Sequence, residues 1–255
     1  ICGFTGRPNE PVLKKMTDSL FHRGPDEDGF YSDGKVNLGI RRLSIIDIAT
    51  GHQPIHNEDK GIWVVFNGEI YNFQELRRNL EEKGHRFYTS HSDTEVIVHL
   101  YEEYGNDFAH KINGMFAIAL WDKNNDKLIL IRDRMGVKPL FYAQLDNNLV
   151  FGSEIKAILS HPDYMPDINY EGIYHYFTFK NVPAPLTAFK GIYALLPGEM
   201  IIFSNKNIFK ERWWKINFDE SEDYTEECIK ERIFALLEDS TRLRMNSDVT
   251  VGAYL

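Results

Sequence analysis

The sequence predicts an α+β fold in which antiparallel sheets are covered by helices. Three pairs of apolar segments flank short polar turns at residues 122–126, 146–148 and 204–207, which is the pattern of β-hairpins. Helical segments lie between other strands, without the strict alternation of strand and helix that a parallel sheet requires. No internal repeat is evident.

The elements can be placed from local periodicity. Apolar residues at helical spacing predict a helix over 11–21, and the Gly-, Pro- and acid-rich segment 22–29 is expected to be a loop. Residues 35–43 and 61–66 have the apolar pattern of strands. The hairpin strands are expected at 116–121 with 128–132, 140–145 with 149–151, and 199–203 with 208–214.

Two further helices are predicted from capping-box spacing. Asn72 and Glu75 precede one segment of helical periodicity, and Ser92 and Glu95 precede the other. Each segment ends on a glycine, a residue that often terminates helices. The two helices are therefore expected to span residues 72–84 and 92–105.

The character of the chain changes after Trp214. An acidic, loop-like segment is followed by an amphipathic helix over 224–244 and an apolar, strand-like segment, VTVGAYL, over 249–255. A helix leading into a buried strand is typical of the start of a new unit. We therefore expect one domain over 1–214, and over 215–255 the linker, helix and first strand of a second, truncated domain.

Composition excludes several classes of protein. The content of 43% hydrophobic and 26% charged residues is that of a folded domain, and the net charge of −9 without a basic stripe argues against nucleic acid or an anionic membrane as partner. The longest apolar run, 115–121, is too short to span a membrane, and no signal-peptide pattern is visible. Two cysteines fit a reducing compartment, so a cytoplasmic protein is expected.

Common motifs for other chemistries are missing from the sequence. It has no glycine-rich phosphate loop, no H-E-x-x-H, no C-x-x-C and no G-x-S-x-G. His52 and His56 have helical spacing, but Pro54 between them argues against a helix. We therefore predict no metal site and expect the histidines to lie on the surface or in loops.

Eight segments occur in a distinctive order: HRGPDEDG (22–29), RRLSIIDI (41–48), GHQPI (51–55), FNGEIYN (66–72), SDTEVI (92–97), INGMFAIALWD (112–122), RDRMGVKPLFY (132–142) and GSEIKAIL (152–159). Together they resemble the class II glutamine amidotransferases, specifically the asparagine synthetase branch. This resemblance implies an N-terminal-nucleophile hydrolase fold, a four-layer sandwich of two antiparallel sheets between helix layers, followed by the start of an α/β ATP-pyrophosphatase domain.

The resemblance also implies the chemistry. In this family the thiolate of an N-terminal cysteine attacks the side-chain amide of glutamine, and the α-amine of the same cysteine acts as the base. Such an amine suits the task because its unperturbed pKa is about 7.7–8.0. Ammonia leaves, and water releases glutamate from the thioester. The glutaminase part needs no cofactor.

Individual roles can be transferred to positions of this sequence. Asn67 and Gly68, in FNGE, match the oxyanion hole, and Arg42, in RRLS, matches the arginine that clamps the α-carboxylate of glutamine. Taken singly, each has an ordinary alternative. Asn-Gly is a common turn, and Arg42 could form a surface ion pair.

Four more residues match the same substrate pocket. Leu43 and Ile46 match neighbours that shape it. Glu69 and Asp93 match its acidic side, which receives the α-ammonium of glutamine. The alternative for Asp93 is that it helps to cap the following helix.

The N-terminus allows two alignments with the family's opening C-G-I/F-x-G. In one, Cys2 is the nucleophile and Ile1 is removed during maturation. In the other, Ile1 and Cys2 occupy the third and fourth positions, and the nucleophile lies three residues upstream of Cys2. The second is favoured, because the chain starts with Ile rather than Met and the spacing from Cys2 to Arg23 is short for the family. Cys2 is then expected to be a buried strand residue.

The C-terminal segment indicates what the ammonia is used for. VTVGAYL resembles the strand that leads into the S-G-G-x-D-S loop of asparagine synthetases, which makes Leu255 a candidate ATP-binding residue. The parent enzyme is expected to use ATP and magnesium to amidate aspartate, and a homodimer is a family expectation. Two alternatives stay open: amidation of another carboxylate by a tailoring enzyme, and a non-catalytic glutamine-binding domain.

Overall fold

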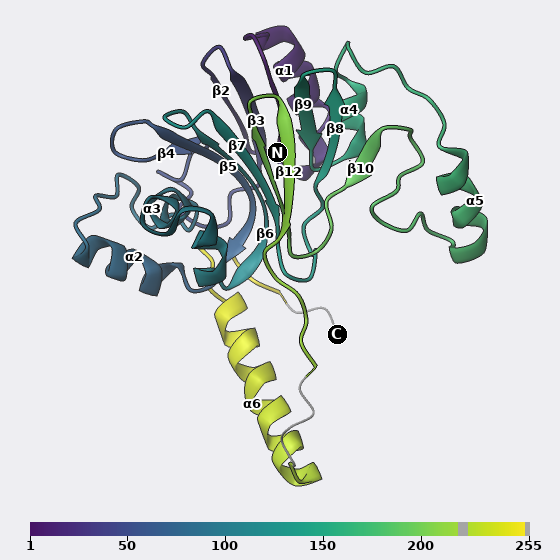
Figure 1. The fold of residues 1–255 in the computed structure, drawn as a ribbon. Helices are drawn as coiled ribbons and strands as arrows, with labels where there is room; N and C mark the ends of the chain where they lie inside the picture. The colour runs from purple at the N-terminus through teal and green to yellow at the C-terminus, as the bar shows by residue number, and fades with distance from the viewer. Residues whose placement is uncertain (219–223, 253–255) are drawn as a thin grey trace.

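Two antiparallel sheets form the centre of the computed structural model, which describes residues 1–218 and 224–252 (Figure 1). Sheet A contains, in spatial order, β10 (Ile192–Ala194), β8 (Phe141–Leu145), β9 (Asn148–Gly152), β1 (Cys2–Thr5), β3 (Val36–Arg42) and β2 (Glu27–Ser32). Sheet B contains, in spatial order, β12 (Asn207–Arg212), β11 (Glu199–Ser204), β7 (Lys127–Arg132), β6 (Gly114–Asp122), β5 (Ile62–Ile70) and β4 (Ile55–His56).

Helices cover the outer face of each sheet. Those packed on sheet A are α1 (Glu10–Asp18) and α4 (Ile155–Leu159), and those on sheet B are α2 (Phe73–Glu82) and α3 (Glu95–Tyr104), as Figure 1 shows. Short 3₁₀ turns at Phe21–Arg23 and Gly105–Lys111 join these layers to the sheets. One apolar cluster lies between the sheets and another under each helix layer. The expected four-layer α+β sandwich is therefore confirmed.

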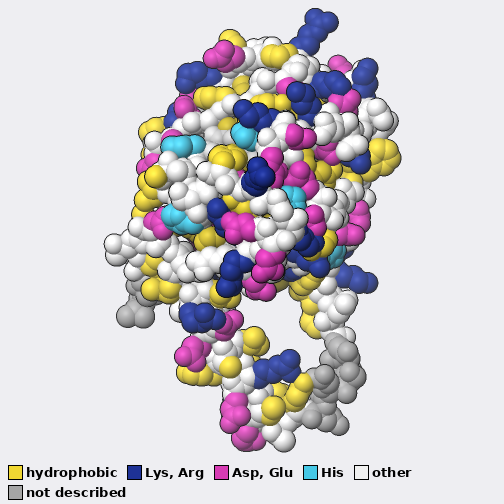
Figure 2. Space-filling view, turned by 90° about the vertical axis from the view of Figure 1, so that its left-hand side faces the viewer, with side chains coloured by type: hydrophobic (Ala, Val, Ile, Leu, Met, Phe, Trp, Pro, Cys, Tyr) yellow, Lys and Arg dark blue, Asp and Glu magenta, His cyan; other side chains and the backbone are white. Residues whose placement is uncertain are grey.

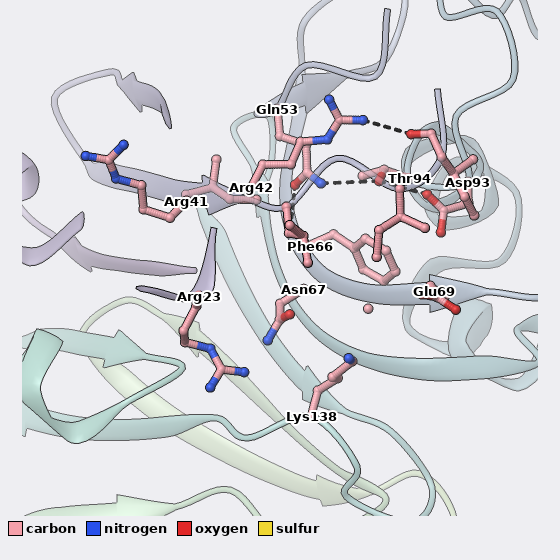
Figure 3. Close-up of a pocket in the computed structure, with 15 residues that line it drawn as sticks. Arg23, Arg41, Arg42, Gln53, Phe66, Asn67, Glu69, Asp93, Thr94 and Lys138 are labelled. Atoms are coloured by element: carbon pink, nitrogen blue, oxygen red, sulfur yellow. Dashed lines mark hydrogen bonds between the residues drawn. The ribbon is translucent and has the colours of Figure 1, made fainter. Parts of the chain in front are cut away.

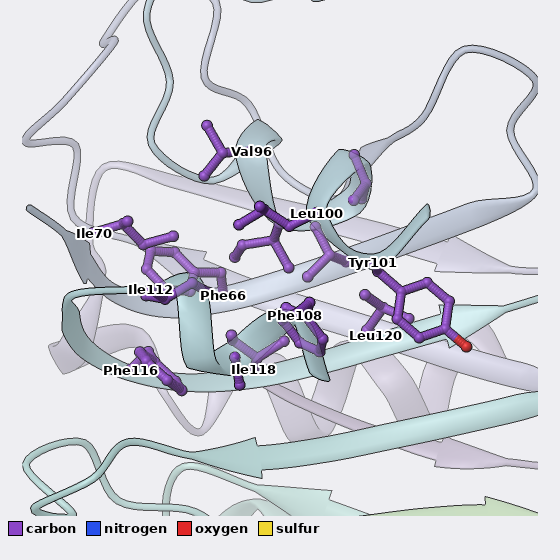
Figure 4. Close-up of a cluster of buried hydrophobic side chains, with 14 of the residues drawn as sticks. Phe66, Ile70, Val96, Leu100, Tyr101, Phe108, Ile112, Phe116, Ile118 and Leu120 are labelled. Carbon is purple, nitrogen blue, oxygen red and sulfur yellow. The ribbon is translucent and has the colours of Figure 1, made fainter. Parts of the chain in front are cut away.

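Strand β6 shows why the central strands are apolar on both faces. Successive side chains of a strand point to opposite faces. Ala117, Ala119 and Trp121 belong to the cluster between the sheets, whereas the alternate residues face α2 and α3. Figure 4 shows two of the latter, Ile118 and Leu120, beside side chains of the helix layer. A strand packed on both faces needs a continuous apolar run, which is what the sequence has here.

The helices predicted over 72–84 and 92–105 are confirmed as α2 and α3, but their capping interactions are not. Asn72 Oδ1 accepts the N–H of Asn113 at 2.9 Å, so its side chain bonds to the residue just before β6 instead of capping α2. The Glu95 carboxylate accepts the N–H of Tyr88 at 2.8 Å and the N–H of Thr89 at 2.9 Å. Capping-box spacing therefore located both helices, although tertiary contacts use the polar side chains.

Two other expectations need correction, and one helix was not expected. The segment 22–29 is only partly a loop, because β2 begins at Glu27 and pairs with β3. Residues 249–252 do not form the expected strand, and the remainder of that segment, 253–255, lies outside the described residues. Helix α5 (Tyr170–Phe179) was not predicted, because its aromatic residues are mostly exposed and show no apolar stripe.

The C-terminal helix agrees with the expectation for residues 224–244. It is α6 (Glu226–Arg244), which has no buried residue and extends away from the sheets in Figure 1. The segment after it returns to the domain, where the N–H of Asp248 donates to Ile45 O at 3.0 Å. None of the described helices is long and apolar enough to cross a bilayer. The domain boundary near residue 214 stays a prediction.

Candidate active site

A cavity of about 280 Å³ lies where the loop after β3 meets β5 and the start of α3 (Figure 3). Ligand sites for drug-sized molecules span about 300–1,000 Å³, so this cavity suits a small metabolite. All seven residues assigned to glutamine binding from the sequence line it: Arg42, Leu43, Ile46, Asn67, Gly68, Glu69 and Asp93. They come from three separate segments that only the fold brings together.

The edge of β5 forms one wall of the cavity. β4 pairs only with residues 63–64 of β5, so among the described residues no strand lies beside the second half of that edge. The Phe66 N–H donates instead to Gln53 Oε1 at 2.7 Å, and the Ile70 N–H donates to Asp93 Oδ2 at 3.0 Å. Gly68 lies between these two residues. Because N–H groups alternate along a strand, its N–H points from the same edge into the cavity.

The neighbouring strand supports this orientation of Gly68. Its register partner Phe116 donates its N–H to Asp133 Oδ2 at 3.2 Å and accepts the N–H of Asp133 at 2.9 Å, so Phe116 is bonded away from β5. A Cβ on Gly68 would also lie 2.1 Å from Met115 O. Position 68 therefore requires glycine for close strand contact, and its N–H is turned away from β6. The alternative that Asn-Gly forms a turn is wrong here, because both residues lie within β5.

Ser153 links Asn67, on sheet B, to Ile1, just before the first strand of sheet A. Its Nδ2 lies 3.5 Å from Ser153 Oγ, a buried atom just after β9. The same Oγ lies 3.1 Å from the main-chain nitrogen of Ile1, and the Ser153 N–H donates to Ile1 O at 2.8 Å. Ser153 thereby fixes Ile1 beside the Asn67 amide. No role for Ser153 is predicted from the sequence, although this residue lies in the family segment GSEIKAIL.

Arg42 is buried and organises the wall opposite β5. Its Nη1 donates to Glu27 Oε1 at 2.6 Å, and its Nη2 donates to the carbonyl oxygens of Ile46 and Asp47 at 2.8 and 3.0 Å. A guanidinium has five N–H donors, of which these bonds use three. With 7% of its surface exposed, Arg42 is not the surface ion pair of the alternative interpretation.

The acidic side of the cavity is short of positive charge. Burial raises the pKa of Asp93 to about 6, and the nearby Glu69 adds to this, although hydrogen bonds from Ile70 and Thr94 oppose it. Burial also raises the pKa of Glu69, against the effect of Lys138. Asp93 accepts from the Ile70 N–H, at the edge of β5, and the N-cap residue of α3 is Thr94. Two carboxylates with raised pKa values favour a cationic ligand group.

Cys2 lies outside this cavity. Its side chain is fully buried among α1 and α4, with Sγ 3.3 Å from Thr17 Oγ1, whereas Ile1 points into the cluster between the sheets. Burial raises the pKa of the Cys2 thiol, which disfavours the reactive thiolate. Cys228 lies exposed on α6, so neither cysteine lines the cavity. Leu255 lies outside the described residues.

Other cavity residues had no predicted role. Gln53 is in the segment GHQPI, and Thr94 is in SDTEVI, so both were in family motifs but were not singled out. Arg23 and Lys138 add positive charge on the side away from Asp93, and Figure 3 shows Asn67 between Arg42 and Lys138. Only the three-dimensional arrangement identifies these residues as cavity walls.

Comparisons with known proteins identify relatives of this chain. Asparagine synthetase [glutamine-hydrolyzing] 1 of Bacillus subtilis (strain 168) is 38% identical over 266 aligned residues, which cover all of this chain and 42% of that protein. Asparagine synthetase [glutamine-hydrolyzing] 2 of the same strain is 54% identical over 151 residues, or 59% of this chain and 20% of that protein. The chain therefore spans less than half the length of these curated relatives.

A solved structure shows the same fold. The allosteric regulatory enzyme of purine biosynthesis superposes with a TM-score of 0.62 at 20% identity, over 84% of this chain and 48% of the other. A likeness at that identity concerns the fold alone. In contrast, the sequence model of the family described as "Glutamine amidotransferase domain" matches residues 1–214 of this chain. These residues include the whole cavity. The chain therefore belongs to the glutamine amidotransferase domain family.

Proposed function

We propose that this chain is the glutaminase part of an asparagine synthetase, which releases ammonia from glutamine for the ATP-dependent amidation of aspartate elsewhere in the full-length protein. One observation carries the glutaminase assignment: an amide donor, a strand-edge N–H, a buried arginine and two carboxylates line a single small cavity. The curated relatives, which are glutamine-hydrolysing asparagine synthetases, support the rest of the proposal.

The cavity suits both ends of glutamine. The remaining N–H donors of Arg42 bind the α-carboxylate, and Asp93 with Glu69 receives the α-ammonium. The side-chain amide then lies toward Asn67 and Ser153. When a thiolate attacks the amide carbon, Asn67 Nδ2 and the Gly68 N–H stabilise the developing oxyanion. Ammonia leaves, and water cleaves the thioester to release glutamate.

The nucleophile is proposed to be a cysteine three residues upstream of Cys2. Side chains alternate along a strand, so that residue shares the strand face of Ile1 and not that of Cys2. This is the face that meets Asn67 through Ser153. Its free α-amine would serve as the base.

The acceptor half of the reaction is inferred from the relatives. Residues 215–255 are assigned to the linker and helix at the start of a synthetase domain, with Leu255 near its ATP site. ATP and magnesium would act there and not in the glutaminase cavity. A homodimer in the cytoplasm is the corresponding expectation for the full-length protein.

Mass and activity of the full-length protein test the proposal. Intact-mass measurement and N-terminal sequencing should find a mature chain that begins with cysteine, and a glutaminase assay should find glutamate and ammonia. Turnover of glutamine by a chain without an N-terminal cysteine would overturn the mechanism. With ATP present, aspartate should become asparagine. Amidation of another carboxylate would indicate a tailoring enzyme, and glutamine binding without turnover would indicate a non-catalytic domain.

Arg42→Ala tests the substrate clamp. We expect the KM for glutamine to rise about 10- to 100-fold, because hydrogen bonds to charged groups contribute about 1.5–3 kcal/mol. Arg42→Lys should recover little of this, since an ammonium cannot replace the bidentate guanidinium. Arg78→Ala, on the exposed face of α2, is the matched control. An unchanged KM in Arg42→Ala would remove this residue from the clamp.

A further inference from the structure

Two histidines and two glutamates converge outside the glutamine cavity. Glu58 lies in the loop after β4, His85 follows α2, and His99 and Glu102 lie on α3. One potential ligand atom from each of the four side chains lies within 4.8 Å of the others. None of the four lines the glutamine cavity. Figure 2 shows this face of the molecule, where histidine and acidic side chains are interspersed.

Of the four distances between imidazole nitrogens and carboxylate oxygens, three match those between ligands of one tetrahedral ion and the fourth is shorter. His85 Nδ1 lies 3.6 Å from Glu58 Oε1 and 3.5 Å from Glu102 Oε2. His99 Nδ1 lies 3.5 Å from Glu58 Oε2 and 3.0 Å from Glu102 Oε2. Zinc binds imidazole nitrogen and carboxylate oxygen at about 2.0–2.2 Å, which places neighbouring ligands of a tetrahedron about 3.3–3.6 Å apart. Both imidazoles present the same nitrogen, Nδ1, to both carboxylates.

The far side of each imidazole faces another carboxylate. His85 Nε2 lies 3.2 Å from Glu103 Oε1, and the buried His99 Nε2 lies 3.7 Å from Glu95 Oε1. In metal sites the second nitrogen of a ligating histidine commonly faces a carboxylate, which sets the tautomer and orients the ring. His85 has this contact, whereas His99 Nε2 faces Glu95 from beyond hydrogen-bond distance.

Hydrogen bonds also position the carboxylates of Glu58 and Glu102. Asn57 Nδ2 donates to Glu102 Oε1 at 2.8 Å, which leaves Oε2 of Glu102 directed at the histidines. The N–H of Arg86 donates to Glu58 Oε1 at 2.8 Å. These bonds come from the loop after β4 and from the segment after α2, so both glutamates are positioned by groups outside α3.

The charge balance of this region favours a bound cation. Four carboxylates, those of Glu58, Glu95, Glu102 and Glu103, surround the histidine pair, and Lys83 pairs with Glu103 at the rim. With neutral imidazoles the region has a large excess of negative charge. The rival interpretation is that the cation is a proton: burial lowers the pKa of His99, but Glu102 and Glu95 raise it to about 9.

We propose that Glu58, His85, His99 and Glu102 bind a structural zinc ion that ties α3 and the end of α2 to the loop after β4. Two nitrogen and two carboxylate ligands in a tetrahedron suit zinc better than magnesium or calcium, which prefer oxygen-only, higher-coordinate sites. The sequence analysis predicted no metal site, and this inference departs from it. In the sequence, the only feature that indicated this metal site was the spacing of His99 and Glu102 along a helix.

Zinc binding to the full chain tests the proposal. After removal of metal with a chelator, zinc should bind stoichiometrically in competition with a chromophoric chelator, and it should raise the melting temperature. Cobalt(II) in its place should give the visible absorption of a tetrahedral site. Glu58→Gln and Glu102→Gln should each weaken zinc binding by more than about 100-fold, because even contacts outside the ligands affect metal affinity about 10- to 100-fold.

Matched variants separate the site from general charge effects. Glu103→Gln, which removes the carboxylate behind His85, should weaken binding by roughly 10-fold. Glu82→Gln, exposed on α2, should bind zinc as the wild type does. Glu58 and Glu102 are partly exposed, so both variants are expected to fold, and circular dichroism checks this. Absence of zinc binding by the wild type, or equal binding by Glu58→Gln and Glu102→Gln, would overturn the proposal and favour the protonated histidine pair. Neither readout involves glutamine.

Discussion

Asp93 lies just before α3 and His99 lies within it, and the two buried groups, an acid and a base, both lie near other carboxylates. Asp93 is a carboxylate with too little positive charge nearby, and burial raises its pKa to about 6. His99 is an imidazole among several carboxylates, and its pKa is raised to about 9 in spite of burial. Both centres therefore have unbalanced negative charge when their carboxylates are ionised.

The two centres differ in the source of the cation that balances their carboxylates. The glutamine cavity is open to solvent, and the cation proposed there is the ammonium group of a substrate that enters and leaves. The histidine cluster is held by three segments, and the cation proposed there is permanent. If this view is correct, the two centres can be disabled independently, although both depend on the same helix.

The largest expected effect separates catalysis from zinc binding. Asn67→Ala should lower the kcat for glutamine hydrolysis by about 10²–10³-fold, because loss of one oxyanion donor typically has that cost. Zinc affinity should stay at the wild-type value, since Asn67 has no contact with the cluster. Asn79→Ala, exposed on α2, is the control for the substitution itself. Loss of zinc along with activity would show that the two centres are coupled.

Asp93→Asn should stabilise the fold while it weakens glutamine binding. The pKa of Asp93 is higher in the folded state than its usual 3.8, so protonated Asp93 contributes to the free energy of unfolding. This contribution is fully present below pH 3.8 and is lost as the pH rises through about 6. A shift of this size corresponds to about 3 kcal/mol at neutral pH. Asparagine carries no charge and can still accept from the Ile70 N–H.

Urea unfolding as a function of pH measures this effect. At pH 8 the Asp93→Asn variant should be more stable than the wild type, and near pH 4 the two should converge. A variant that is less stable than the wild type at pH 8 would mean that Asp93 has a cationic partner in the unliganded fold. In that case the contrast with the histidine cluster would fail.

The pH dependence of glutamine binding gives a third, more graded test. Below about pH 6 Asp93 takes up a proton, so glutamine affinity should fall by up to about tenfold per pH unit. Binding measured by calorimetry between pH 5 and 8 should show this slope, and Asp93→Asn should be weak at every pH. Glu69 also has a raised pKa, so Glu69→Gln is needed to assign the slope. A wild-type affinity independent of pH would remove Asp93 from the ammonium site.

Most of the fold and the cavity could be predicted from the sequence, because both depend on local patterns or motifs. The hairpins have turn residues at fixed positions, and β6 has the apolar run of a strand packed on both faces. The seven cavity residues lie in short family segments, so their roles could be assigned from the resemblance without knowledge of the packing. Residues 22–29 were harder, because the acidic strand β2 has one exposed face and its pattern resembles a loop.

The remaining features depend on contacts between distant segments. Gln53 matters because β4 is too short to cover the edge of β5, and Ser153 matters because it fixes Ile1 beside Asn67. The histidine cluster joins residues from three segments, of which only His99 and Glu102 are close in sequence. Such sites have no signature in a single sequence, because their spacing is set by the length of the intervening elements.

The smallest expected effect concerns the hydrogen bond that Gln53 accepts from the open edge of β5. Gln53→Ala removes the acceptor for the Phe66 N–H, but water in the cavity can replace it, so the loss of stability should be about 1 kcal/mol. Gln53→Glu keeps an acceptor there and should retain most of that stability. A loss of several kcal/mol in Gln53→Ala would show that the edge is sealed from solvent. A sealed edge would restrict the entry and exit of glutamine, and the contrast between an exchangeable cation in the cavity and a permanent one at the histidine cluster would fail.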